Sequence, residues 1–333
     1  MRVAVVGAGS WGTTFAGLLT ANGPTRLWAR RPALAEEINQ RRTNAVYLPR
    51  TRLPLGLRAT ADLAEAVAGA EVVAVAVPTQ GFRPVLEALA TVLDAGVPVV
   101  SLVKGLERHT RRRMSEVVAE VLPGHPTGAL TGPNLAREIA AGLPAAAVLA
   151  MGDEGVAARL QQAFGTEAFR VYTNGDVIGC EISGALKNVV AIAAGMSDGL
   201  ELGDNARAAI VTRGLAELTR LAVALGGDPR TCAGLAGLGD LVVTCSSDKS
   251  RNHQVGVALG RGRPLAEVVA ELHMVAEGIE GAEVVCQLGA ELGVEVPIAE
   301  QTAAVCAGRL GAAEALGALM QRRLRSELHG LGK

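Results

Sequence analysis

Short apolar runs alternate with helix-length amphipathic segments through the first half of the chain. The runs occupy residues 2–7, 25–29, 71–78, 97–103, 127–131, 144–150 and 168–172. Compact apolar runs of this kind are typical of strands buried on both faces of a parallel sheet. Their alternation with helical patterns predicts an α/β architecture, in which a doubly wound Rossmann-type sheet forms the N-terminal domain.

The alternation stops after Gly175, and the apolar period lengthens to that of helices. Helical patterns occupy residues 181–196, 205–225, 251–260, 264–271, 280–292 and 299–308. A chain of 333 residues is long enough for two domains that each bury a core. We therefore expect a Rossmann-type domain over residues 1–176 and an all-α domain over residues 177–333.

The first strand leads into a glycine-rich turn and then a helix. Residues 7–12 read Gly-Ala-Gly-Ser-Trp-Gly, the GxGxxG pattern of dinucleotide-binding turns. In that pattern Gly7 permits the tight turn, Gly9 lets the backbone approach a pyrophosphate, and Gly12 lets the helix pack on the strand. The helix N-terminus then presents N–H groups to the phosphates. The alternative is a glycine-rich turn without a ligand.

Two arginines follow the second strand. A cofactor without a 2′-phosphate usually meets Asp or Glu at this place, whereas this chain has Arg30 and Arg31. Two guanidiniums favour a 2′-phosphate, and hence NADP over NAD. The alternative is a solvated basic pair. Pro32 suits the first turn of the next helix.

Composition and charge narrow the classes of function. The formal net charge is −1 and both signs are interspersed, so nothing favours nucleic acid or an anionic membrane as a partner. No run approaches the roughly 20 apolar residues of a membrane span, and a strand from Arg2 leaves no room for a signal peptide. The five cysteines are scattered and without CxxC pairs, which favours reduced thiols in the cytoplasm and disfavours a zinc site.

Lysine is rare in this chain. Of 32 Lys and Arg residues only four are lysines, and Lys187 lies in the small, apolar run 183–195. Because Lys exchanges protons in a range that Arg does not reach, Lys187 is a candidate acid/base group. The alternative is a surface lysine on an amphipathic helix. Lys104 follows the strand at 97–103, at the edge of the sheet where ligands bind in α/β folds.

Other polar residues stand in unusual surroundings. Asp240 follows the glycine-rich run 234–239, where a carboxylate is costly unless paired, although a helix-cap aspartate is the alternative. Ser250-Arg251-Asn252 opens a helix, as in a phosphate site or an ordinary N-cap. Gly132-Pro133-Asn134 follows the strand-like run 127–131 and predicts a tight turn into a helix, with Pro133 at the helix start. Glu277 alone reads as an exposed helix-end residue, although it could bind a nicotinamide amide or ribose.

Together these motifs resemble the bacterial-type NAD(P)-dependent glycerol-3-phosphate dehydrogenases from Arg2 to about Arg325. The resemblance is carried by the segments 7–12, 103–107, 132–134, 184–199, 205–207, 212–214, 236–241 and 250–252. It implies reduction of dihydroxyacetone phosphate to sn-glycerol 3-phosphate with NADPH or NADH, which supplies phospholipid synthesis. It also implies a small-molecule substrate, a homodimer and a cytoplasmic location.

The resemblance further implies roles for individual residues. The catalytic group is Lys187 as proton donor and acceptor, Lys104 at the substrate carbonyl, and Asp240 beside the catalytic lysine. The substrate group adds Gly132, Asn134, Ser250, Arg251 and Asn252. The cofactor group is Gly7, Gly9, Ser10, Trp11, Gly12, Arg30, Arg31, Lys104, Ala136, Arg251, Val275 and Glu277. Asn134 departs from the Thr or Ser of many bacterial members, which bears on local geometry.

Two other readings remain. A related two-domain reductase, of the β-hydroxyacid dehydrogenase or ketopantoate reductase type, would place a substrate carboxylate at Arg251. A non-catalytic NADP-binding protein would keep the loop 7–12 but would need neither Lys187 nor Asp240.

Overall fold

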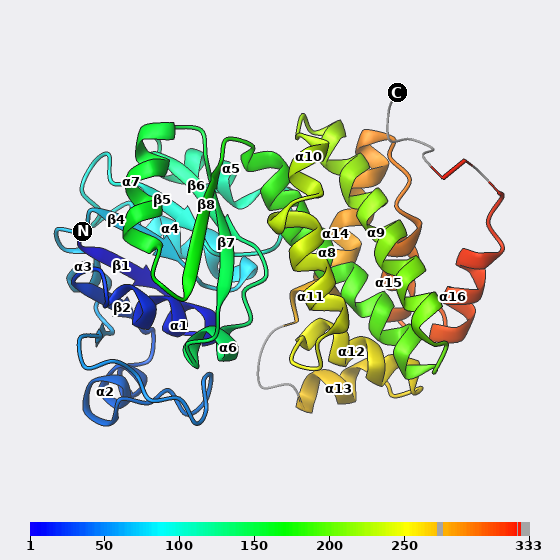
Figure 1. Ribbon diagram of the computed structural model, residues 1–333, viewed down its shortest axis with the longest axis horizontal. Coiled ribbons are helices and arrows are strands. Elements are labelled where there is room, and N and C mark those ends of the chain that lie inside the picture. Colours follow the sequence, from blue (N-terminus) through cyan, green and yellow to red (C-terminus); the bar gives the residue numbers. More distant parts are fainter. Residues whose placement is uncertain (272–275, 325, 328–333) are drawn as a thin grey trace. The chain divides into compact units, whose positions relative to one another are not determined.

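The chain divides into two compact units in the computed structural model, which describes residues 1–271, 276–324 and 326–327 (Figure 1). The first unit comprises Met1–Val103 and Arg112–Val177, and the second comprises Lys104–Arg111 and Ile178–Lys333. The division expected from the sequence assigns the segment Lys104–Arg111 to the first unit. In the structure this segment, and with it Lys104, belongs to the helical unit.

The first unit is built on an eight-stranded sheet. Its strands are β1 (Val3–Val6), β2 (Thr25–Trp28), β3 (Arg58–Thr60), β4 (Val72–Val75), β5 (Val99–Ser101), β6 (Thr127–Thr131), β7 (Ala145–Met151) and β8 (Phe169–Asn174). The spatial order is β3-β2-β1-β4-β5-β6-β7-β8. Neighbouring strands are parallel except that β7 runs antiparallel to β6, a reversal that the sequence did not predict.

Helices cover both faces of this sheet. They are α1 (Ser10–Leu19), α2 (Pro32–Arg41), α3 (Leu63–Val67), α4 (Phe82–Leu89), α5 (Met114–Val121), α6 (Ala136–Ala140) and α7 (Glu154–Phe164), with a 3₁₀ turn η1 (Thr79–Gly81). Val3 and Val5 of β1 join one core with Phe15 of α1, whereas Ala4 and Val6 join another with α3, α4 and α5. The doubly wound prediction is therefore confirmed, since alternate residues of a strand face opposite sides.

Two predicted helix starts need correction. The helix after Gly132-Pro133-Asn134 begins at Ala136 with Leu135 as its N-cap, so Pro133 lies in the preceding bend rather than in the helix. The first helix was expected after the glycine-rich turn 7–12, but it begins at Ser10, within that run, and ends at Leu19. By contrast, Pro32 occupies the first position of α2, as predicted.

In the described residues of the second unit, every secondary-structure element longer than a single bridge or turn is a helix. Its helices are α8 (Val177–Gly199), α9 (Asp204–Ala224), α10 (Pro229–Cys232), α11 (Asp240–Ser246), α12 (Arg251–Gly260), α13 (Leu265–Glu271), α14 (Glu277–Leu292), α15 (Pro297–Cys306) and α16 (Ala312–Met320), with a π-helical turn η2 (Leu235–Gly239). The sequence pattern predicted six of these helices. It missed α10, η2, α11 and α16.

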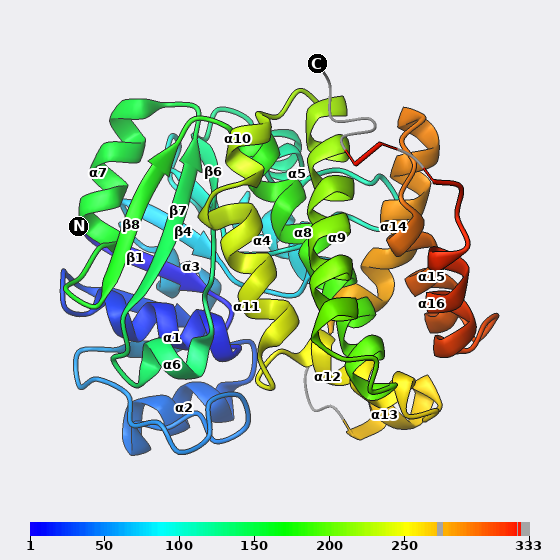
Figure 2. The ribbon, with the colours of Figure 1, turned by 45° about the vertical axis from the view of Figure 1, so that its right-hand side comes forward.

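Helix α8 is buried over most of its length, and glycines allow its neighbours to approach it. Figure 2 shows α8 between α11 and α9. A Cβ atom added at Gly195 of α8 would lie 2.2 Å from the carbonyl oxygen of His253 on α12. One added at Gly214 of α9 would lie 2.5 Å from Val190 of α8, and one at Gly278 of α14 would lie 2.5 Å from the Asn188 carbonyl oxygen. Backbones therefore pack closely around α8, which fixes the few polar side chains that it carries.

Judged by length and composition alone, helix α8 could span a membrane. We expected no apolar run of that length, and this prediction is wrong for α8. However, 89% of its most apolar window is buried within the protein, as for the core helix of a helical domain. Its apolarity is explained by the packing around it.

Candidate active site

Lys187 is a buried lysine at the middle of α8. Its side chain is 8% exposed, and its Nζ lies 3.3 Å from Asp240 Oδ1 and donates to Thr244 Oγ1 at 2.9 Å. Burial lowers the pKa of Lys187 to about 8, which the attraction of Asp240 opposes and the repulsion of Lys104 reinforces. The alternative of an exposed surface lysine does not hold. An amine with this pKa is able to give and take protons near neutral pH.

Asp240 is shared between two ammonium groups. Its Oδ2 lies 2.6 Å from Lys104 Nζ, while its Oδ1 faces Lys187 Nζ. The aspartate side chain is 2% exposed and that of Lys104 is 15% exposed. A buried carboxylate needs such partners, because an isolated one would be strongly destabilising. The three residues come from positions far apart in the sequence, and the fold of the second unit brings them together.

The glycine-rich run before Asp240 places that carboxylate. Leu235–Gly239 forms the π-helical turn, in which a Cβ atom at Gly237 would lie 2.0 Å from the Cys232 carbonyl oxygen. Asp240 then begins α11, which continues directly from that turn because Gly239 and Asp240 both have helical dihedral angles. Thr244, one turn later, donates its hydroxyl to the Asp240 carbonyl oxygen at 2.6 Å. The sequence reading assigned Thr244 no role, although its i+4 spacing from Asp240 was a usable signal.

A chain of buried amides connects Lys104 to the starts of α12 and α14. Asn188 donates from Nδ2 to the Lys104 carbonyl oxygen at 2.9 Å and accepts at Oδ1 from Asn252 Nδ2 at 2.9 Å. Asn252 Oδ1 in turn accepts from the Gly278 N–H at 3.0 Å. Asn252, expected to bind substrate, thus uses both ends of its amide on protein atoms. Asn188 was also missed, although it adjoins Lys187.

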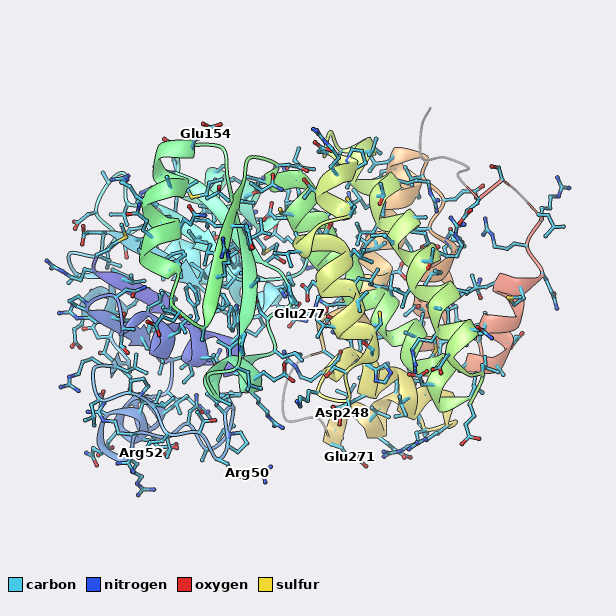
Figure 3. The ribbon with its side chains drawn as sticks, viewed as in Figure 1. Arg50, Arg52, Glu154, Asp248, Glu271 and Glu277 are labelled. Atoms are coloured by element: carbon cyan, nitrogen blue, oxygen red, sulfur yellow. The ribbon has the colours of Figure 1, made fainter. Side chains whose placement is uncertain are left out.

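The predicted phosphate residues lie at the start of α12. Ser250 is the N-cap and its Oγ accepts from the His253 N–H at 3.3 Å, while Arg251 is the first helical residue and is exposed. Glu277 begins α14 (Figure 3). Val275 lies outside the described residues. No cluster of three or more His, Cys, Asp or Glu side chains that could hold a metal ion occurs in the part of the chain that the structure describes.

In the first unit, the glycine loop has the geometry of a dinucleotide-binding turn. Gly7 has φ +118°, and a Cβ atom there would lie 2.6 Å from the Ala76 carbonyl oxygen. A Cβ atom at Gly12 would lie 1.9 Å from the Gly7 carbonyl oxygen, whereas one at Gly9 would meet nothing within 4 Å. Gly7 and Gly12 are thus required by the fold, but Gly9 leaves open space next to the N-terminus of α1. An open approach at this glycine is what a pyrophosphate-binding turn requires.

The side chains of Ser10 and Trp11 in the glycine loop contact other parts of the protein. Ser10 Oγ donates to the Tyr47 carbonyl oxygen at 2.5 Å. The Trp11 ring packs on Phe15 and Phe169, with ring centroids 5.5 and 6.1 Å away, and its Nε1 is buried without a partner among the described residues. The loop therefore offers a ligand chiefly its backbone.

Arg30 and Arg31 stand directly after β2, beside this loop. The Gly7 N–H donates to the Trp28 carbonyl oxygen at 3.1 Å, which joins the two strand ends. Both arginines are exposed, and the Arg31 guanidinium lies 5.4 Å from the centroid of the Tyr47 ring. The two cations are thus available at the strand end where the ribose of a dinucleotide is usually held.

Gly132, Asn134 and Ala136 belong to the first unit as well. Gly132 has φ +124° at the end of β6, and the Ala136 carbonyl oxygen accepts from Thr14 Oγ1 of α1 at 3.3 Å. Both amide atoms of Asn134 are buried without a hydrogen-bond partner in the described structure. Such a group is costly unless a ligand satisfies it. Each unit thus holds part of the predicted set of residues.

Comparison with known proteins agrees with these features. The family model for the N-terminus of NAD-dependent glycerol-3-phosphate dehydrogenase matches residues 2–157, and the model for its C-terminus matches residues 176–317. A glycerol-3-phosphate dehydrogenase [NAD(P)+] of Sphingopyxis alaskensis is 51% identical over 329 residues, with 99% of each chain covered. One of Thermobifida fusca is 52% identical over 334 residues, again with 99% of each covered.

A solved structure agrees as well. The crystal structure of glycerol-3-phosphate dehydrogenase from Coxiella burnetii superposes with a TM-score of 0.93 at 38% identity, covering 96% of this chain and 99% of that one. A ketopantoate reductase from Ralstonia eutropha shares the fold alone, with a TM-score of 0.61 at 19% identity over 95% of this chain and 99% of its own. From its sequence and structure together, this chain belongs to the NAD-dependent glycerol-3-phosphate dehydrogenase family.

Proposed function

We propose that this protein is an NAD(P)-dependent glycerol-3-phosphate dehydrogenase that reduces dihydroxyacetone phosphate to sn-glycerol 3-phosphate and catalyses the reverse oxidation. The observation that carries the proposal is the buried group of Lys187, Asp240 and Lys104, in which one lysine has a pKa of about 8. Family membership supports the choice of substrate, and the product feeds phospholipid synthesis.

Lys187 is the proton donor for ketone reduction in this proposal. As hydride reaches the carbonyl carbon, negative charge grows on the carbonyl oxygen, and Lys187 Nζ delivers a proton to that oxygen. Lys104 adds a second positive charge beside Asp240. A donor or cation aimed at a developing oxyanion is typically worth roughly 3–4 kcal/mol of barrier. In the reverse reaction the neutral amine of Lys187 accepts the alcohol proton.

Asp240 and Thr244 orient the lysines. Without the carboxylate, burial and the charge of Lys104 would lower the pKa of Lys187 further. The hydroxyl of Thr244 donates to the Asp240 carbonyl oxygen and so presents its lone pair to Lys187 Nζ. With one ammonium proton directed to Thr244 and another to Asp240, the third remains for substrate.

The cofactor is held by the first unit in this proposal. The backbone of Gly7–Gly12 and the N-terminus of α1 bind the pyrophosphate, and Gly9 provides the open approach. When bound, the reduced nicotinamide supplies the hydride. Arg30 and Arg31 support a preference for NADP over NAD, because guanidiniums recognise phosphate.

The substrate phosphate is assigned to the start of α12. Arg251 offers a guanidinium at the first residue of this ten-residue helix, whose N-terminus favours an anion. Ser250 and Asn252 shape this turn through their bonds to His253 and Gly278. Phosphate binding energy then holds a small triose in register for reaction. The partnerless amide of Asn134 supports a role in ligand binding for that residue.

The experiment that tests the proposal follows oxidation of NADPH and NADH by the purified protein with dihydroxyacetone phosphate. We expect rapid turnover with the phosphorylated ketone and little with dihydroxyacetone, the matched substrate without phosphate. Turnover with a 2-keto or 3-keto acid, and none with dihydroxyacetone phosphate, would instead establish the related keto-acid reductase.

We also propose a homodimer in the cytoplasm. The dimer is supported by the family resemblance, and light scattering should then give about twice the chain mass of 34.1 kDa. All five cysteines are free, which suits a reducing compartment. A mass of one chain at working concentrations would refute the dimer.

A further inference from the structure

A short segment of the first unit, Asn44–Leu48, is fastened across the glycine loop, and we call it the strap. Asn44 is fully buried and donates from Nδ2 to the Ala8 carbonyl oxygen at 3.0 Å and to Thr13 Oγ1 at 2.9 Å. Its Oδ1 accepts from the Tyr47 N–H at 3.1 Å, and its carbonyl oxygen accepts from the Leu48 N–H at 2.9 Å. One asparagine thus joins the strap to both ends of the glycine loop.

Two further contacts fix where the strap lies. Ser10 Oγ donates to the Tyr47 carbonyl oxygen at 2.5 Å, which attaches the strap to the first residue of α1. On the other side, Glu37 of α2 accepts from the Ala45 N–H and from Thr43 Oγ1, both at 2.8 Å. Tyr47 is therefore held at a defined place between the glycine loop and α2.

The ring of Tyr47 meets the guanidinium of Arg31. The guanidinium carbon lies 5.4 Å from the ring centroid, within cation–π range. Stacking on a ring fixes the orientation of a guanidinium through its flat face, and the N–H groups at its edge can still donate to a phosphate. Arg31 makes no ion pair with any side chain that the structure describes, so its charge is not neutralised by a carboxylate.

The backbone around Arg31 also favours an anion. Arg31 is the N-cap of α2, and its carbonyl oxygen accepts from the N–H groups of Leu34 and Ala35. The first turn of α2 contains no acidic residue. Arg50 and Arg52, on the loop that continues from the strap beside α2, add positive charge to this side of the unit (Figure 3).

We propose that Tyr47 determines cofactor specificity by holding Arg31 as the ligand of the 2′-phosphate of NADP. The strap then couples two parts of cofactor recognition, because the segment that orders Arg31 is also bonded to the pyrophosphate-binding loop. Arg30 has no such ring beneath it among the described contacts and contributes mainly long-range attraction. This inference rests on the proposed NAD(P)-dependent function.

Cofactor affinity tests this proposal without any need for turnover. The full chain is titrated with NADPH and with NADH, and binding is followed by the fluorescence of the reduced nicotinamide. Tyr47→Leu should weaken NADPH binding about two- to fivefold, the range of an exposed cation–π contact, and leave NADH binding within about twofold of wild type. Arg31→Ala should weaken NADPH binding more strongly, by about tenfold or more.

The chain offers a matched control. Arg170 lies 5.2 Å from the ring centroid of Tyr172 on β8, an equivalent pair on the edge strand at the other end of the strand order from β3 and β2. Tyr172→Leu removes the same kind of contact and should leave both cofactor affinities unchanged. Tyr47→Phe keeps the ring and should behave as wild type. Retained NADH binding shows that each variant is folded.

The possible results separate the inference from the proposed function. Equal loss of NADPH and NADH binding in Tyr47→Leu would overturn the inference and assign the strap a purely structural role. Unchanged NADPH binding in that variant would overturn it as well. If the wild-type protein binds neither cofactor, both the inference and the proposed function fail. If the wild type reduces dihydroxyacetone phosphate while Tyr47→Leu keeps the wild-type NADPH to NADH ratio, only the inference fails.

Discussion

The two candidate sites of this molecule are constructed in different ways. The dinucleotide loop consists of six consecutive residues and offers mainly backbone, with its side chains turned to core packing or to the strap. The lysine–aspartate group consists of side chains from residues 104, 187 and 240, with Thr244 and Asn188 as supports. One site depends on where the backbone lies, and the other depends on charge and burial.

This contrast predicts different sensitivities. The fold of the loop should tolerate changes in charge nearby, but it should not tolerate a single added methyl group where backbones touch. The lysine–aspartate group should keep its fold when a side chain is exchanged for one of similar shape, yet lose its chemistry. The following variants test this contrast, from the largest expected effect to the smallest.

Lys187→Ala should lower turnover by about 10²–10⁴-fold, the usual contribution of a general acid, and leave NADPH affinity close to wild type. Lys187→Arg should fail to restore activity, since an arginine keeps its proton at these pH values. Steady-state kinetics and cofactor titration measure the two effects separately. Turnover close to wild type in either variant would remove Lys187 from the chemistry.

Asp240→Asn should lower kcat/KM for dihydroxyacetone phosphate by roughly 10- to 100-fold, the scale of a misoriented catalytic group. The loss of the carboxylate also removes the attraction that opposes the fall in the pKa of Lys187. The alkaline limb of the rate profile should therefore move to lower pH. A limb at the wild-type pH would show that Asp240 does not act on Lys187 electrostatically.

Gly12→Ala and Gly9→Ala form a matched pair in the loop. The first places a methyl group 1.9 Å from the Gly7 carbonyl oxygen and should destabilise the first unit by about 1–3 kcal/mol. The second meets nothing within 4 Å and should fold normally, but should weaken cofactor binding by about tenfold because it occupies the approach of the pyrophosphate. Thermal unfolding and cofactor titration distinguish them. Wild-type affinity in Gly9→Ala would argue against the assigned phosphate position.

The smallest effect concerns a buried carboxylate outside the site. Glu217 of α9 accepts from the Ile298 and Ala299 N–H groups at the start of α15, and burial raises the pKa of its carboxyl to about 7 from 4.5. The folded state thus binds this proton more tightly, so stability falls as pH rises from about 4.5 to 7.

Glu217→Gln should remove roughly 1–3 kcal/mol of the stability difference between pH 5 and pH 8. Denaturant unfolding at the two pH values measures it, and Glu87→Gln, at an exposed position of α4, is the control. The same pH dependence in Glu217→Gln as in wild type would mean that another group is responsible.

The sequence predicted what depends on consecutive residues or on an unusual residue type. The glycine loop was predicted because its strand, turn and helix are contiguous. Lys187 and Asp240 stood out because a lone charge in an apolar, glycine-rich run is unusual. The doubly wound sheet followed from the alternation of apolar runs and helical patterns.

What the sequence did not predict depends on tertiary contacts. Asn188 and Tyr47 are ordinary residues of a helix and a loop, and only the fold shows that they contact the Lys104 carbonyl and Arg31. The i+4 spacing of Thr244 from Asp240 was a signal, but its bond to Lys187 is visible only in the fold. The run 234–239 has too many glycines for a helical period, so η2 and α11 were missed. The antiparallel direction of β7 was not predicted either, because an apolar run reads the same for a parallel and an antiparallel buried strand.

The central claim, that Lys187 acts as the proton donor with a pKa of about 8, is tested most directly by the pH dependence of the wild-type enzyme. The quantity to measure is kcat/KM for dihydroxyacetone phosphate reduction from pH 6 to 10, which reports groups of the free enzyme. We predict that reduction falls as pH rises through about 8, because the amine loses the proton it must donate, and that glycerol 3-phosphate oxidation rises over the same range. A reduction profile that stays flat to pH 10 would contradict the account.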